Sequence, residues 1–88
     1  MDGAQAMNSK EVLKRLSALG FIIKPHQVAY YLKLGIIKPW FDAKGRGKVR
    51  YFSEKNMVDI AIAASLQEIG FTLPKIKALI ESLSEKRQ

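Results

Sequence analysis

The chain has 88 residues, the length of one domain, and a chain this short buries only roughly 60–65% of its unfolded surface, which leaves little room for a deep enzyme cleft. It has no cysteine and a single histidine, which excludes disulfides and thiolate metal sites and leaves one imidazole that cannot hold a metal alone. Neither a run of about 18 apolar residues nor a signal-peptide pattern is present, so we expect a soluble, intracellular protein.

The net charge of +7 is concentrated in the middle of the chain. Residues 1–23 carry three positive and two negative side chains, residues 24–55 carry eight and two, and residues 56–88 carry four of each. A local excess of this kind is typical of a protein that binds a partner lined with phosphates. An ordinary solvated basic surface is the alternative.

A flexible tail is expected over residues 1–8, followed by a helix over residues 9–19. The apolar residues of this segment recur at helical spacing: Val12, Leu13, Leu16 and Leu19. Asn8 or Ser9 can cap its start, and Gly20 can end it. Residues 21–23, which are Phe, Ile and Ile, are expected to form a buried connector.

Pro25 suits the first turn of a second helix, where its missing N–H costs nothing. This helix is expected to end at Gly35, after apolar residues at mixed helical spacing. Residues 36–39 should be extended, because the residue before Pro39 is pushed out of the helical region.

A β-hairpin is predicted between Trp40 and Phe52. Aromatic and β-branched residues flank a segment, residues 42–48, whose Gly45 and Gly47 supply the positive φ angles that a turn needs. Such a hairpin would form a wing. Trp40 and Phe41 could stack on exposed bases, but aromatic residues in this position more often belong to the core.

Two further helices complete the predicted fold. Ser53 caps the third, which ends at Gly70, and Thr72 caps the fourth. Much of the inward face of the third helix is expected from Met57, Ala61, Ala64, Ser65, Leu66 and Ile69. The fourth helix carries an apolar stripe formed by Leu73, Ile76, Leu79, Ile80 and Leu83. The sequence therefore predicts a mainly α, winged helix-turn-helix fold with four helices and a two-stranded hairpin, as one domain over residues 9–83. Residues 84–88 would be a tail or the start of a linker helix.

Three segments of the chain carry recognisable motifs. They are residues 28–39, VAYYLKLGIIKP, residues 50–53, RYFS, and residues 69–76, IGFTLPKI. In this order they resemble the stretches L-R-Y-Y-E-x-x-G-L-[IL]-x-P, R-x-Y-S and L-G-F-S-L-x-x-I of the MerR (mercury-resistance regulator) family of transcription factors. The resemblance spans residues 9–83. It implies a bacterial-type regulator that binds double-stranded DNA in the cytoplasm, at the nucleoid, with the second helix in the major groove and the wing on the backbone or the minor groove.

The DNA-binding residues expected on this basis lie in the second helix and the wing. They are Lys24, His26, Gln27, Tyr30, Lys33, Lys44, Arg46, Lys48 and Arg50. Gln27 can pair with adenine, and of the paired tyrosines Tyr30 is favoured for a phosphate contact while Tyr31 packs. For His26, a groove contact and a simple exposed position are equally open, and Lys44 alone could serve only solubility.

The chain departs from the family at Ala29, where the family has arginine, and at Lys24, where a capping Ser or Thr is usual. Lys33 or the wing can compensate for the arginine that is missing at position 29. The connector before the second helix is also longer than the family's tight turn. In the family, a long helix follows this domain and pairs two subunits. The paired regulator twists the promoter so that RNA polymerase can use it. The chain is therefore either the DNA-binding part of a longer regulator or a complete small protein, and a dimer is expected only if the chain continues or through contacts on DNA.

Two other functions are compatible with the same residues. One is an excisionase-like architectural protein that bends DNA, and the other is a protein-interaction module that uses the fourth helix. We expect no enzyme activity, no cofactor and no metal, because the eight carboxylates form no recognisable pair and no nucleophile stands with a base.

Overall fold

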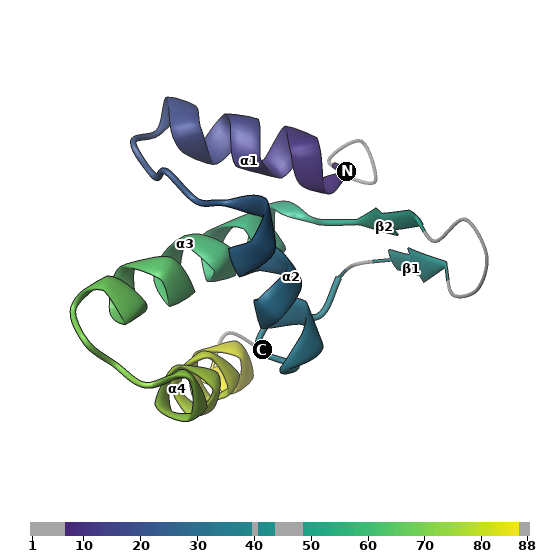
Figure 1. Ribbon diagram of the computed structural model, residues 1–88. Helices are drawn as coiled ribbons and strands as arrows, with labels where there is room; N and C mark the ends of the chain where they lie inside the picture. The colour runs from purple at the N-terminus through teal and green to yellow at the C-terminus, as the bar shows by residue number, and fades with distance from the viewer. Residues whose placement is uncertain (1–6, 40, 44–48, 87–88) are drawn as a thin grey trace.

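The computed structural model describes residues 7–39, 41–43 and 49–86. Four helices and two short strands follow one another along the chain (Figure 1). They are α1 (Ser9–Ala18), α2 (Pro25–Lys33), β1 (Phe41–Ala43), β2 (Val49–Tyr51), α3 (Glu54–Glu68) and α4 (Leu73–Lys86). The expected mainly α fold with four helices is confirmed. None of the described helices is both long enough and apolar enough to span a lipid bilayer.

The start of α1 is held by a reciprocal pair of hydrogen bonds. The backbone N–H of Glu11 donates to the side-chain oxygen of Asn8 at 2.8 Å, and the N–H of Asn8 donates to the Glu11 carboxylate at 2.9 Å. Met7 exchanges two backbone hydrogen bonds with Phe52 and is 4% exposed. The prediction of a flexible tail through residue 8 is therefore wrong for Met7, which pairs beside β2. Asn8 caps α1, as one of the two candidate caps that the sequence offered.

Glycine ends three of the helices, as predicted. Gly20, Gly35 and Gly70 have φ angles of 99°, 78° and 105°. Side chains other than glycine rarely adopt this left-handed conformation, so these positions fix where α1, α2 and α3 stop.

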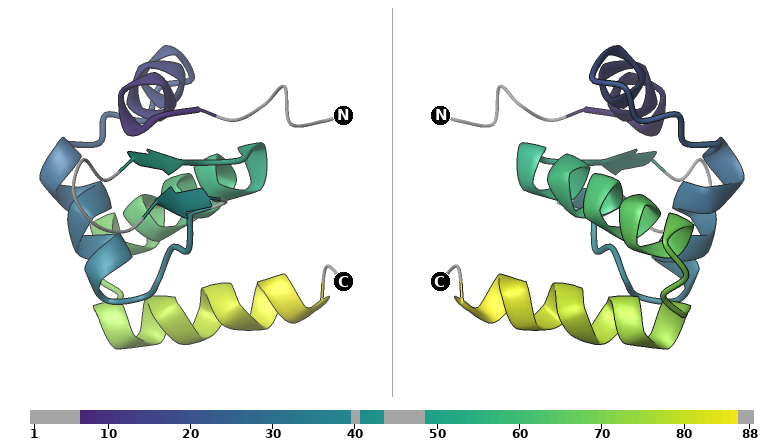
Figure 2. Two further views of the ribbon diagram at one scale, coloured as in Figure 1. Left: turned by 90° about the vertical axis from the view of Figure 1, so that its right-hand side faces the viewer. Right: turned by 90° about the vertical axis from the view of Figure 1, so that its left-hand side faces the viewer.

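The core lies between the helices and the segment that follows β2. Figure 2 shows α1 and α4 on opposite sides of the domain with α3 between them. The largest fully buried side chains are Tyr31, Phe52, Leu16, Ile60, Ile76 and Val12. The α4 stripe is only partly buried, because Ile76 and Ile80 are covered while Leu79 and Leu83 are 37% and 43% exposed.

The connector between α1 and α2 corrects one prediction. Only Ile23 is buried, whereas Phe21 is 37% exposed and Ile22 is 78% exposed. All three side chains are apolar, so the sequence alone could not show which of them is buried.

The inward face of α3 corrects a second prediction. Its buried residues are Asn56, Asp59, Ile60 and Ala63, whereas Ser65 is exposed and Ile69 is 71% exposed. Met57, Ala61, Ala64 and Leu66 are only half-buried. Apolar residues lie all around this helix, so the sequence pattern gave no reliable indication of which side faces the core.

The two strands pair antiparallel, with Phe41 opposite Tyr51 and Ala43 opposite Val49. The residues that would form the tip, 44–48, lie outside the described residues, as does Trp40. The strands are therefore where the hairpin was expected, and the wing itself stays a prediction.

Asn56 joins α3 to the segment that precedes β1. Its side chain accepts from the N–H of Ser53 at 3.0 Å and donates to the carbonyl of Lys38 at 2.8 Å, and it is 7% exposed. Ser53 in return accepts from the N–H of Asn56. Sequence reasoning identified Ser53 as the cap but missed Asn56, although a polar side chain three residues after a cap is the signal that could have found it.

Replacing Asn56 with alanine is expected to lower the free energy of unfolding by about 2–3 kcal/mol, because the Ser53 N–H loses its acceptor and the Lys38 carbonyl loses its donor. Asn8→Ala removes an exposed cap alone and should cost about 1 kcal/mol. Urea unfolding followed by circular dichroism measures both values. Equal losses for the two variants would show that the bond to Lys38 contributes nothing.

Candidate functional site

Helix α2 has two chemically different faces. Val28 and Tyr31 are buried in the core, and between them on the other side Ala29 and Tyr30 are exposed. The outward face carries His26, Tyr30 and Lys33, which follow one another at intervals of four and three residues and so stand in one row. Three of the nine expected site residues are thus brought together.

The paired tyrosines have opposite environments. Tyr31 is 0% exposed and donates its hydroxyl to the side-chain oxygen of Gln67 on α3 at 2.7 Å. Burial raises the pKa of the Tyr31 phenol above its usual value, and a hydrogen bond with the Gln27 side chain lowers it in part. Tyr30 is 49% exposed. The packing role predicted for Tyr31 is confirmed.

The first turn of α2 is capped from within the helix. Lys24 has no capping side chain, but its backbone N–H donates to the side-chain oxygen of Gln27 at 3.0 Å. Gln27 is half-buried and holds both this bond and its bond with Tyr31. The departure at Lys24 is thereby compensated, and Gln27 is turned toward the protein rather than displayed beside His26. Pairing of Gln27 with a base stays a prediction that requires these bonds to change.

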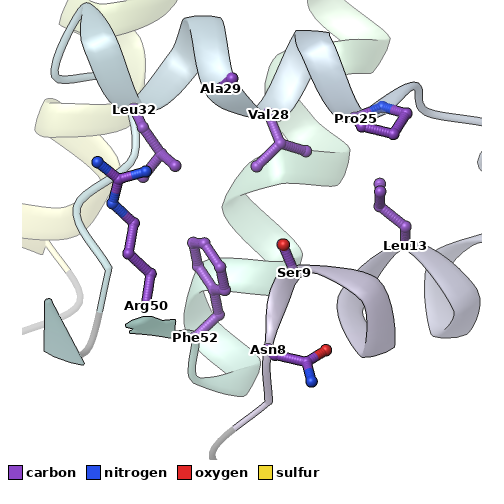
Figure 3. Close-up of a pocket in the computed structure, with 9 residues that line it drawn as sticks. All are labelled: Asn8, Ser9, Leu13, Pro25, Val28, Ala29, Leu32, Arg50 and Phe52. Carbon is purple, nitrogen blue, oxygen red and sulfur yellow. The ribbon is translucent and has the colours of Figure 1, made fainter. Parts of the chain in front are cut away.

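A cavity of about 330 Å³ lies between α1, α2 and the end of β2. Its walls are mostly apolar, and the side chains of Asn8, Ser9 and Arg50 add polar groups. Figure 3 shows Arg50 extending from β2 toward α2, with its guanidinium beside Leu32. Ala29, the position where α2 itself lacks an arginine, lines the same cavity three residues before Leu32. Sequence reasoning predicted Arg50 as a site residue, but it did not predict that Arg50 reaches α2 or that Ser9 lines the cavity.

The four other expected site residues are all cations. Lys24 is exposed at the start of α2. Lys44, Arg46 and Lys48 lie outside the described residues, between two strands that the structure places beside α2. Within residues 24–53 the sequence has seven Lys or Arg and one Asp, so the segment holding α2 and the strands is strongly basic.

Replacing Tyr31 with phenylalanine is expected to lower the free energy of unfolding by about 1 kcal/mol, because the hydroxyl shared with Gln67 and Gln27 is lost. Tyr30→Phe is the matched control, and it should leave stability unchanged because that hydroxyl is at the surface. Chemical unfolding of the two variants tests this. A larger loss for Tyr30→Phe would reverse the roles assigned to the two tyrosines.

In the described part of the chain, no three His, Cys, Asp or Glu side chains are grouped closely enough to hold a metal ion. Residues 9–83 match the model of a known protein family, described as MerR HTH family regulatory protein. A search of curated proteins found no match.

Proposed function

Because the chain belongs to the MerR family of helix-turn-helix regulatory proteins, we propose that it binds specific sites on double-stranded DNA, with α2 in the major groove and the β1–β2 segment against the backbone or the minor groove. Members of this family are DNA-binding regulators of transcription. What we propose beyond this is how the chain contacts DNA and that it prefers specific sites.

The outward face of α2 is the observation that carries the proposal. It bears an imidazole, a phenol and an ammonium group in a row, while the opposite face is fixed by the core and by the Tyr31–Gln67 hydrogen bond. A rigid helix of about 10–12 Å diameter fits the major groove, which is about 12 Å wide. Side chains held on one face of such a helix can then reach base edges in a fixed register.

The proposed contacts with DNA have two roles: some position the protein on the duplex, and others recognise the bases. Lys33, Arg50 and the Tyr30 hydroxyl are suited to phosphate oxygens, which fix the orientation of the protein on the duplex. His26, near the start of α2, is the side chain best placed for a base edge. Arg50 lines the same cavity as Ala29, and it is the residue proposed to supply from β2 the guanidinium that α2 lacks.

Lys44, Arg46 and Lys48 are assigned to the sugar-phosphate backbone or to the minor groove. Gly45 and Gly47 alternate with these cations in the sequence, and the absence of side chains there lets a backbone approach a nucleic-acid strand closely. Arg46, the central cation, is the one proposed for the minor groove.

A titration of duplexes selected from a random-sequence pool tests the proposal. We expect enrichment of a common site, and a dissociation constant for that site at least about 1,000-fold below that for unselected duplex. If about six phosphates are contacted, the log–log dependence of affinity on salt should have a slope near −5. No enriched site, or equal affinity for all duplexes, would contradict sequence-specific binding.

A further inference from the structure

Three polar side chains join the start of α2 to the end of α3 through consecutive hydrogen bonds. The backbone N–H of Lys24 donates to the side-chain oxygen of Gln27 at 3.0 Å, and the Tyr31 hydroxyl donates to the side-chain oxygen of Gln67 at 2.7 Å. The side chains of Gln27 and Tyr31 share a further hydrogen bond. The Tyr31 hydroxyl therefore has one amide partner on its own helix and another on α3.

The direction of each bond follows from the groups involved. A phenol has one proton, and Tyr31 gives it to Gln67, so the Gln27 N–H donates to the phenol oxygen. The effect of Gln27 on the Tyr31 pKa agrees, because a donor to the phenol oxygen favours the ionised form and lowers the pKa. The Gln27 amide thus uses its oxygen for Lys24 and its N–H for Tyr31.

Recognition of an adenine requires Gln27 to leave both partners. The base is read by one amide that accepts from adenine N6 and donates to adenine N7. The bond with the Lys24 N–H is at the surface, so water can take the place of Gln27 there. Tyr31 is 0% exposed, and a buried hydroxyl that is left without a partner costs free energy. The Tyr31 hydroxyl is therefore the group that opposes the release of Gln27.

Gln67 keeps this hydroxyl bonded while Gln27 is away. Because the Tyr31 proton goes to Gln67, the hydroxyl still has a partner on α3 when Gln27 turns to a base. We propose that Gln67 is a specificity-determining residue, which lets Gln27 recognise an adenine by holding the Tyr31 hydroxyl. This inference rests on the proposed function, since Gln27 meets an adenine only if α2 enters the major groove. Gln67 acts through Tyr31 and needs no contact with DNA.

The surroundings of the two amides allow this exchange of partners. A hollow of about 410 Å³ is lined by both Gln27 and Gln67, the first half-buried and the second exposed. Side chains at the wall of a hollow can change rotamer without displacing the core. Gln27 also lies in the first turn of α2, directly after His26. The first turn of a helix in the major groove is the part whose side chains reach base edges.

Binding of base-substituted duplexes tests the role of Gln67. In the site selected by the parent chain, each adenine is replaced in turn by guanine, and the adenine read by Gln27 is the one whose replacement no longer matters in Gln27→Met. The parent chain should prefer adenine there by about tenfold or more. Gln67→Met, of similar length but unable to accept the Tyr31 proton, should reduce this preference below about twofold and leave the other positions unchanged.

Two further variants separate this role from a structural one. Gln67→Glu keeps an oxygen that accepts the Tyr31 proton, so it should retain the preference for adenine. Tyr31→Phe removes the hydroxyl that needs a partner, so the double variant of Tyr31→Phe with Gln67→Met should regain the tenfold preference. A merely structural role would leave the double variant at least as impaired as Gln67→Met. Circular dichroism confirms that each variant is folded.

An unchanged preference for adenine in Gln67→Met would overturn the inference, as would a double variant that does not regain it. Loss of the preference in Gln67→Glu would overturn it as well. A selected site in which Gln27→Met changes the reading of no adenine would overturn this inference alone and leave the proposed function standing. The absence of any selected site would overturn the proposed function, and this inference with it.

Discussion

Replacing Phe52 with alanine is expected to lower the free energy of unfolding by about 3–5 kcal/mol, which for a domain of this size is much of its total stability. Phe52 is 0% exposed, and its backbone N–H and carbonyl both bond to Met7, at 2.7 and 2.9 Å. It also lines the cavity between α1 and α2. The ring therefore ties β2 to the core at the point where α3 begins.

Chemical unfolding measures this loss, with Leu83→Ala as control. Leu83 is 43% exposed on α4, so its truncation should cost less than about 1 kcal/mol. Because Phe52 also holds β2 beside α2, the folded fraction of the Phe52→Ala variant should bind DNA more weakly than the parent chain. A loss of stability below that of Leu83→Ala would mean that Phe52 does not connect these elements.

Replacing both Arg46 and Arg50 with alanine is expected to weaken binding to the selected site at least about 100-fold and to move the salt slope from near −5 to near −4. Arg50 loses a phosphate contact, which accounts for about 0.9 of the slope, and Arg46 loses its contact in the minor groove. Each charged hydrogen bond contributes about 1.5–3 kcal/mol. Fluorescence anisotropy at several salt concentrations gives both quantities.

The control for the Arg46 and Arg50 variant removes two positive charges from α1 instead. Lys14 and Arg15 are exposed on α1, and they follow Leu13, whose side chain lines the cavity beside α2. They are one and two positions further on, about 100° and 200° around the helix, and so turn away from that side. Lys14→Ala with Arg15→Ala should change the affinity less than about threefold. Similar effects of the two pairs would mean that overall charge, rather than the β1–β2 segment, determines binding.

The sequence predicted the helices because their signals are local. Helix ends at Gly20, Gly35 and Gly70 follow from the conformations that glycine allows, and the caps at Asn8 and Ser53 follow from short polar side chains at helix starts. The outward row of α2 was also predictable in part, since the spacing of its residues fixes which of them share a face.

The features that the sequence did not predict depend on contacts between elements. An apolar residue such as Ile22 or Ile69 can be buried or exposed, and only the packing of α1 against α3 decides it. Gln27 has the chemistry to read adenine, but Lys24 and Tyr31 occupy its amide group in the folded chain. The cavity that Arg50 and Ala29 both line likewise arises from a strand meeting a helix across the fold.

Mapping of NMR chemical shifts during titration of the ¹⁵N-labelled chain with the selected duplex tests the account most directly. The largest changes are expected along the outward row of α2, at His26, Tyr30 and Lys33, and at Arg50 of β2, with little change at Val58 on α3. Large changes on α3 or α4 while the α2 row stays unperturbed would contradict the assignment of α2 as the helix that enters the major groove.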